Sequence, residues 1–132
     1  MRIQSHKDLR VWQKSIDLAE HVYRATENFP QSEIFGLAGQ ARRAATSVPA
    51  NIAEGYGRES TRSYLLFLKT ARGSLLELET HVILAERVGL LERNQTTPLL
   101  AESENIGRML YGLIKSLKEG APQSRRHLEM AK

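Results

Sequence analysis

The 132-residue sequence contains no cysteine. This absence excludes a disulfide framework, a thiol nucleophile and a thiolate metal site. No apolar run approaches the roughly 18 residues of a membrane helix, and the polar start MRIQSHKDLRVWQKS lacks the apolar segment of a secretory signal. Strand-like alternation, internal repeats and low-complexity runs are also missing. These absences predict a cytoplasmic helical protein without membrane contact.

Signatures of common enzyme and metal sites are missing as well. Gly55–Arg58 contains Gly-x-Gly, but no strand precedes it and no Gly-Lys-Ser/Thr follows, so neither a dinucleotide fingerprint nor a P-loop is indicated. Di-metal helical bundles need Glu-x-x-His, and no acid stands three positions before any of the four histidines. No nucleophile elbow, kinase or zincin motif occurs. We therefore expect no enzymatic activity, no cofactor and no metal.

The charge is positive and is carried mostly by arginine. Nineteen Lys and Arg residues oppose fifteen Asp and Glu residues, which gives a net charge of +4 and a pI near 9.6. Thirteen of the basic residues are Arg. The planar guanidinium suits phosphate and carboxylate, so this bias favours an interface or nucleic-acid role. A GC-rich genome produces the same bias through its codons, and composition alone leaves both explanations open.

The first half of the chain has apolar and small residues at helical spacing. A first helix is predicted from Asp8 to Asn28. Its apolar positions are Leu9, Trp12, Ile16, Ala19 and Tyr23, with a second stripe at Val11, Leu18 and Val22. A second helix, rich in Gly and Ala, is predicted over about 33–54, with Ser32 as its cap. Pro49 should kink it, and Gly55 and Gly57 should end it with left-handed or open backbone.

The second half predicts two longer helices. The third, over about 60–88, has a strict 4-3 rhythm, and Gly89 closes it. Its seam is Tyr64, Leu68, Ala71, Leu75, Leu78, Val82 and Ala85. The fourth begins at Thr97-Pro98, a cap followed by proline, and ends near Gly120. The predicted fold is an all-α, up-down-up-down antiparallel four-helix bundle over residues 1–120, followed by a flexible basic tail over 121–132.

Charged and apolar residues outside the seam indicate partners. Six basic residues are candidate phosphate contacts: Arg42, Arg43, Arg58, Arg62, Lys69 and Arg72. Continuing the side of Lys69 and Arg72 by sevens reaches Glu79 and Glu86, so one face of the third helix should be basic and then acidic. Such a face suits a phosphate backbone or a neighbouring subunit, and a plain solvated face is the alternative. Leu65, Leu66, Leu76 and Ile83 lie off the seam and favour oligomerisation.

Three segments carry a family resemblance over roughly residues 7–117. They are DLRVWQKSIDLAEHVYRATENFP, GLAGQARRAATSVPANIAEGYGR and FLKTARGSLLELETHVILAERVGLL. The chain resembles bacterial four-helix-bundle proteins encoded in 23S rRNA intervening sequences and, more distantly, the accessory variability protein of diversity-generating retroelements. The resemblance implies a non-enzymatic bundle that assembles into a ring-like homopentamer. For the retroelement relatives it also implies a basic surface that binds nucleic acid and a reverse transcriptase.

The segment NIAEGYGR is interpreted within this resemblance as a turn that ends a helix and holds two helices in register. Its structural residues are Pro49, Asn51, Glu54, Gly55 and Gly57, with Asn51 and Glu54 capping or pairing locally with Arg58. Two functions remain open. The protein is either an oligomeric accessory factor that binds RNA or DNA through the six basic residues, or a scaffold whose charges serve subunits and protein partners.

Overall fold

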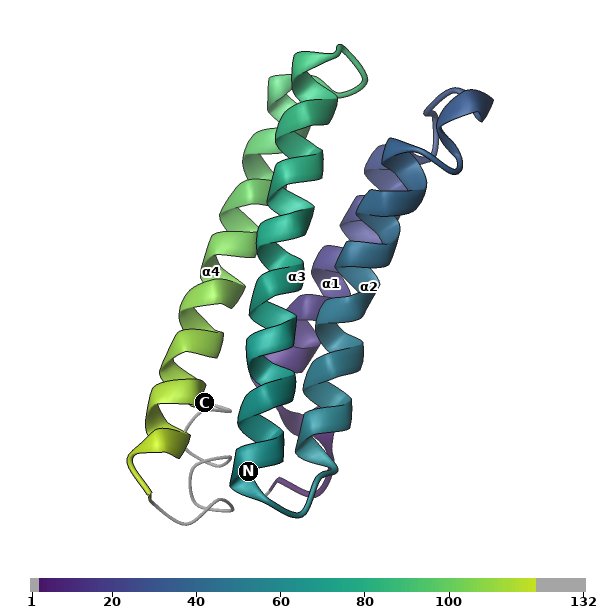
Figure 1. The fold of residues 1–132 in the computed structure, drawn as a ribbon. Helices are drawn as coiled ribbons and strands as arrows, with labels where there is room; N and C mark the ends of the chain where they lie inside the picture. Colours follow the sequence, from purple (N-terminus) through teal and green to yellow (C-terminus); the bar gives the residue numbers. More distant parts are fainter. Residues whose placement is uncertain (1–2, 121–132) are drawn as a thin grey trace.

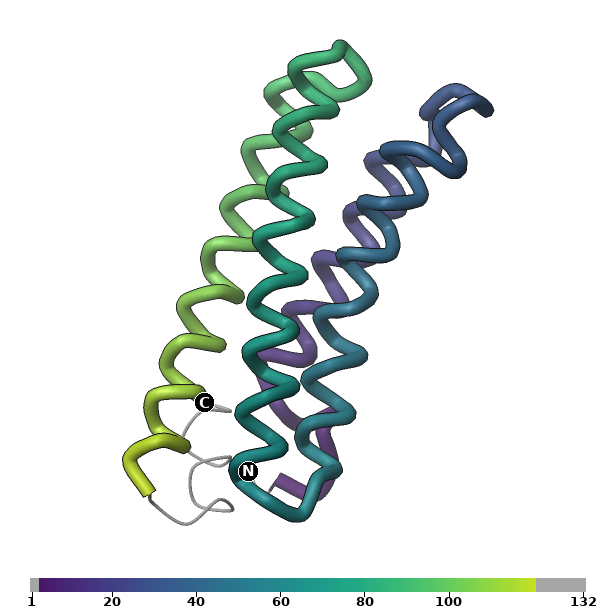
Figure 2. The backbone as a smooth tube through the Cα atoms, viewed as in Figure 1, coloured from purple at the N-terminus to yellow at the C-terminus, as the bar shows by residue number. Residues whose placement is uncertain are grey.

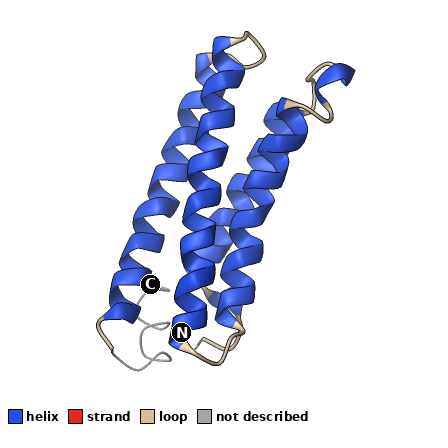
Figure 3. Ribbon diagram, in the orientation of Figure 1, coloured by secondary structure: helices blue, strands red, loops and turns tan. Residues whose placement is uncertain are grey.

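The computed structural model describes residues 3–120 (Figure 1). Four helices follow one another: α1 (Arg10–Thr26), α2 (Leu37–Tyr56), α3 (Thr61–Arg87) and α4 (Arg93–Lys118). Two short 3-10 helices, η1 (His6–Asp8) and η2 (Gln31–Glu33), precede α1 and α2. Each helix runs antiparallel to the one before it, and the described residues form no strand (Figure 3). The predicted all-α four-helix bundle is confirmed, and the predicted tail over 121–132 lies outside the described residues.

The helices associate most extensively through α2 and α3, and least through α1 and α4. The tube view shows the α1–α2 pair diverging from the α3–α4 pair toward the end that carries the connection between α1 and α2 (Figure 2). None of the helices in the described range is long and apolar enough to cross a membrane.

The core confirms the predicted seam of α3 and corrects that of α1. All seven seam residues of α3 are buried, because the strict 4-3 rhythm keeps them in one continuous apolar stripe toward the other helices. In α1 the second stripe is buried, whereas Ile16 and Tyr23 of the first stripe are 39% and 46% exposed. Both stripes had helical spacing, and the neighbouring helices determine which of them enters the core.

The starts of α2 and α4 differ from the predicted positions. Residues 31–33 form η2, so Ser32 does not cap α2, which begins at Leu37. The carboxylate of Glu33 accepts a hydrogen bond from the Leu37 amide at 3.0 Å instead. Helix α4 begins at Arg93, ahead of the predicted Thr97, because Glu92 and Gln95 form a capping box. Pro98 therefore lies inside α4, where it removes the hydrogen bond to the carbonyl of Asn94.

Candidate nucleic-acid interface

A small polar network fixes the register of α2 against α3 at mid-height. The hydroxyl oxygens of Ser47 and Ser74 lie 2.9 Å apart. The side-chain amide of Asn51 donates to the carbonyl and the hydroxyl oxygens of Ser47, at 2.8 and 2.9 Å. Pro49 is buried, and α2 continues through it to Tyr56. Asn51 therefore supports the helix from within rather than capping its end.

Gly55 serves close packing rather than an unusual backbone. Helix α2 ends at Tyr56 with Gly57 as its C-cap, as predicted. Neither Gly55 nor Gly57 has a positive φ, so the left-handed alternative for this helix end is wrong. Gly89 has φ +85° and closes α3 as predicted. A Cβ on Gly55 would lie 2.8 Å from Cβ of Phe67 and 3.0 Å from a ring carbon of Tyr64. The missing side chain thus lets the last turn of α2 lie directly against α3.

Aromatic side chains pack around Gly55 at the connection between α2 and α3. The rings of Tyr56 and Tyr64 are perpendicular, with centroids 6.4 Å apart. Burial raises the pKa of Tyr64 well above its ordinary value, and the neighbouring Tyr56 adds to the rise. Burial, followed by the charge of Asp8, also raises the pKa of Tyr56. Both phenols therefore stay neutral at physiological pH and serve the packing of the α2–α3 connection.

Arg58 contacts both an acid of α2 and an aromatic ring of α3. Its guanidinium donates to the carboxylate of Glu54 at 2.8 Å, which confirms the expected local pair. The guanidinium also lies over the ring of Phe67, 4.7 Å from the centroid. Both side chains of the ion pair are about half exposed, so the positive charge of Arg58 still faces solvent.

The six candidate basic residues fall into two groups. Arg42 lies on the side of α2 toward α1, where its Nε donates to the hydroxyl of Thr26 at 2.9 Å and its guanidinium covers the ring of Tyr23. About 20 Å of helix, at about 1.5 Å per residue, separates Arg42 from the end of α2 at Tyr56. Arg42 and its exposed neighbour Arg43 are therefore remote from the α2–α3 connection, beside which Arg58 and Arg62 lie.

Arg62, Lys69 and Arg72 are the most available of the candidates. All three are exposed on α3, and none makes a hydrogen bond or ion pair with another residue in the range 3–120. Arg62 also lines a hollow of about 370 Å³ at the start of α3, together with Ser60, Ser63 and Leu66. These three cations can meet an anionic ligand without first breaking an internal contact.

Glu79 and Glu86, the two acids predicted on the second half of this face of α3, form hydrogen bonds within the subunit. The carboxylate of Glu79 accepts a hydrogen bond from the Ser103 hydroxyl at 2.6 Å. Glu86 accepts from the Thr96 hydroxyl and from Arg93, and these bonds lower its pKa below the ordinary value, the Thr96 bond most. Both acids are only partly exposed, at the junction of α3 and α4. They stabilise the subunit itself.

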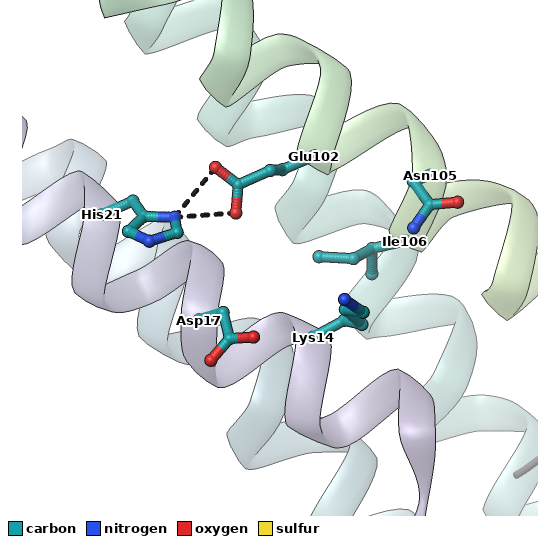
Figure 4. A pocket seen from close by; sticks show the side chains of 6 residues that line it. All are labelled: Lys14, Asp17, His21, Glu102, Asn105 and Ile106. Atoms are coloured by element: carbon teal, nitrogen blue, oxygen red, sulfur yellow. Dashed lines mark hydrogen bonds and ion pairs between the residues drawn. The ribbon is translucent and has the colours of Figure 1, made fainter.

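A polar hollow of about 180 Å³ lies between α1 and α4 (Figure 4). Across it, Nδ1 of His21 lies 2.8 and 2.9 Å from the two carboxylate oxygens of Glu102. Lys14, Asp17 and Asn105 line the same hollow. No three His, Cys, Asp or Glu side chains of residues 3–120 converge as metal ligands. The His21–Glu102 contact ties the two helices that associate least.

The bundle separates its charges along its length. A plane drawn across the bundle through the Ser47–Ser74 contact meets α4 near Arg108 and α1 near Ser15. This register follows from two contacts, Glu79–Ser103 between α3 and α4 and His21–Glu102 between α1 and α4, because all helices rise equally per residue. We call residues 3–15, 47–74 and 108–120 the basic half, and residues 16–46 and 75–107 the acidic half. The basic half carries ten Lys or Arg and four acidic residues, a net charge of +6. The acidic half carries five and ten, a net charge of −5.

This arrangement could not be recognised from α3 alone. The cations of the basic half are Lys7, Arg10, Lys14, Arg58, Arg62, Lys69, Arg72, Arg108, Lys115 and Lys118. They come from η1, α1, α3 and α4 and from the connection between α2 and α3, and they share one half of the bundle only because the helices run antiparallel in a particular register. The candidate set of the sequence analysis contains four of them, together with Arg42 and Arg43 of the acidic half.

Comparison with known proteins identifies the family. A model of the 23S rRNA-intervening sequence protein family matches residues 7–112. The chain belongs to this family. A crystal structure of a protein of unknown function from the S23 ribosomal protein family of Bacteroides thetaiotaomicron is similar, with a TM-score of 0.72 and 27% identity over 80% of this chain and 98% of that one. Among curated proteins none matches. The family and this solved structure carry no indication of an enzymatic reaction.

The chain also exposes apolar side chains on α3, on the side away from the seam. Leu66 and Leu76 are 65% and 60% exposed, and Ile83 and Leu84 are nearly half exposed. Leu65, the remaining residue of the predicted off-seam set, packs partly against the core instead. The exposed glycine at position 73 lies between Leu66 and Leu76, and no atom comes within 4 Å of the place of its missing Cβ. The outward side of α3 therefore presents exposed apolar side chains among its exposed charged residues.

Proposed function

We propose that this member of the 23S rRNA-intervening sequence protein family is a non-enzymatic, cytoplasmic protein that binds RNA or DNA through its basic half. The observation that carries the proposal is the net charge of +6 in the basic half of the bundle. Cations clustered on one surface attract the phosphate backbone of nucleic acids and release counterions when it binds. Because contacts to phosphate carry no sequence information directly, we expect little preference for sequence.

The central contacts in this proposal are Arg62, Lys69 and Arg72, with Arg58 beside them. The first three have free donors, and Arg58 keeps half of its side chain in solvent. Arg42 and Arg43 form a separate group within the acidic half, where nearby carboxylates oppose an approaching phosphate. We expect their contribution to be the smaller one.

The proposal includes assembly into an oligomer. The outward apolar face of α3 gains stability if a neighbouring subunit covers it, and the family resemblance suggests a ring of five. Such a ring repeats one basic end around its axis, so contacts that are weak in a single subunit combine by avidity. The competing function, a scaffold for protein partners, also uses the apolar face but needs no phosphate binding.

The test is binding of the purified protein to labelled single-stranded RNA and DNA over a range of salt concentrations. The Arg62→Glu/Lys69→Glu variant should bind more weakly to every sequence, with a shallower slope of log affinity against log salt. On these single strands the slope should fall by about 0.7 for each phosphate that the variant no longer neutralises. Arg43→Glu is the matched control for Arg62→Glu alone, since it reverses an exposed arginine in the other half.

Oligomer state is measured on the same samples by light scattering. If the intact wild-type oligomer binds no nucleic acid at low salt, the scaffold function replaces the proposed one. If Arg43→Glu weakens binding as much as reversal of Arg62, the basic half is not the binding surface.

A further inference from the structure

One large aromatic side chain of the basic half lies open to solvent. Tyr111 on α4 is 59% exposed. Its side chain makes no hydrogen bond and no ring contact with another residue in the range 3–120. A side chain on a helix leans over the turn that precedes it, and Gly107 stands four residues before Tyr111. No side chain comes within 4 Å of the place of the missing Cβ of Gly107. The surface beside the ring of Tyr111 is therefore open.

The ring lies at the boundary between α3 and α4. In the acidic half, Ile83 of α3 and Leu100 of α4 line one hollow between these two helices. Eleven residues make about three turns, so a residue eleven positions further along a helix lies on the same side of it. In the direction of the basic half, this step leads from Ile83 to Arg72 and from Leu100 to Tyr111. Since α3 and α4 lie side by side (Figure 1), Arg72 and Tyr111 flank the same boundary at one level.

Only cations surround this level of the two helices. Residues 68–76 of α3 and 107–115 of α4, one turn to either side of the pair, contain four cations and no acid. The cations are Lys69, Arg72, Arg108 and Lys115, and all four are exposed. None of their side chains bonds to another residue among residues 3–120. On the side of α4 that carries Tyr111, the next acid is Glu104, about 10 Å further along the helix. An aromatic ring among unpaired cations matches a nucleobase with a phosphate on either side.

We propose that the basic half binds single-stranded nucleic acid, with one unpaired base stacked on the ring of Tyr111 and the flanking phosphates held by the cations around it. This inference rests on the proposed function and specifies its ligand. In a duplex the bases stack on one another, whereas the unpaired base of a single strand is free to stack on an aromatic side chain. Every base has an aromatic face, so this contact is tolerant of sequence.

The experiment compares two probes with the same number of phosphates, oligothymidylate and an abasic strand of equal length. The full wild-type chain should bind oligothymidylate about five-fold or more tightly than the abasic strand, because stacking of one base on an aromatic side chain contributes at least about that factor. Tyr111→Ala should remove this difference. It should leave the slope of log affinity against log salt unchanged, because no cation is lost.

Two further variants separate the ring from its surroundings. Tyr111→Phe keeps the aromatic ring and should bind both probes like the wild type. Tyr23→Ala is the matched control, since Tyr23 is a 46% exposed tyrosine in the acidic half. This control should keep the wild-type preference for oligothymidylate. Light scattering on the same samples measures the oligomer mass, which Tyr111→Ala should not change.

Three results would overturn the inference. The first is equal affinity of the wild type for the two probes, and the second is a Tyr111→Ala variant that retains the preference for oligothymidylate. The third is a lower oligomer mass for Tyr111→Ala, because the ring would then pack against a neighbouring subunit. Failure of the wild type to bind either probe at low salt refutes the proposed function, whereas equal binding of both probes refutes this inference alone.

Discussion

The role of Gly55 can be tested by adding a single methyl group. In Gly55→Ala the new Cβ would meet Cβ of Phe67 at 2.8 Å, a ring carbon of Tyr64 at 3.0 Å and the Tyr64 carbonyl oxygen at 3.3 Å. Overpacking of this kind costs about 1–3 kcal/mol. Alanine recovers up to about 1 kcal/mol in a helix through its better propensity. The free energy of unfolding should therefore fall by roughly 1–2 kcal/mol.

Gly57 and Gly73 provide matched controls for this substitution. The nearest atom to a Cβ on Gly57 would be 3.6 Å away, and nothing lies within 4 Å of one on Gly73. Neither residue has a positive φ, so alanine should be neutral or should stabilise by up to about 1 kcal/mol. In an oligomer, Gly73→Ala also reports on close approach of a neighbour.

The assay is urea denaturation followed by far-UV circular dichroism, with all variants at one protein concentration, because subunit association changes apparent stability. The close-packing argument would be refuted by a Gly55→Ala variant as stable as the wild type. It would also fail if Gly57→Ala were the more damaging substitution.

Three further predictions concern single contacts. The folded-state pKa of Glu86 lies below its ordinary value of 4.5, so its bonds stabilise the fold above that pH and are lost as the pH falls through the lowered value. Thr96→Val should therefore destabilise the protein at neutral pH, and the difference should vanish in acid-denaturation curves at the lowest pH; a constant difference would contradict this. Leu76→Ser, at a residue 60% exposed, should lower the oligomer mass in ultracentrifugation while helix content is kept, and an unchanged mass would place the interface elsewhere. Arg58→Ala breaks a half-exposed pair with Glu54 and should cost less than about 1 kcal/mol in urea denaturation; a larger loss would mean that the packing on Phe67 dominates.

The parts of the fold that could be predicted are those that one helix determines by itself. The seam of α3 was predicted residue by residue because no second apolar stripe of equal strength competes with it. In α1 two stripes compete, and the position of α2, which no local pattern encodes, decides between them. The start of α4 was misplaced because Thr97-Pro98 is a strong cap signal, while the capping box of Glu92 and Gln95 is formed by less typical residues.

The candidate site was predictable only in its residue types. Glu79 and Lys69 lie near one side of α3 in the sequence pattern, yet Glu79 bonds to Ser103 of α4 while Lys69 stays exposed. Likewise, glycine at position 55 could indicate a left-handed turn or a close approach, and only the neighbouring ring of Tyr64 distinguishes them. The separation of charge between the two ends requires the register of four helices, which is a tertiary property.

An even number of antiparallel helices brings the chain back to the end where it started. Residues 3–9 and the last turn of α4 therefore both lie at the basic end, next to the α2–α3 connection (Figure 1). Any group fused at either end of the 3–120 unit, such as an affinity tag or a fluorescent protein, is attached beside Arg58 and Arg62. An acidic fusion there would compete for the cations, and a bulky one would block access to them. A reporter placed in the α3–α4 connection, residues 88–92, would instead leave the basic end open for binding measurements.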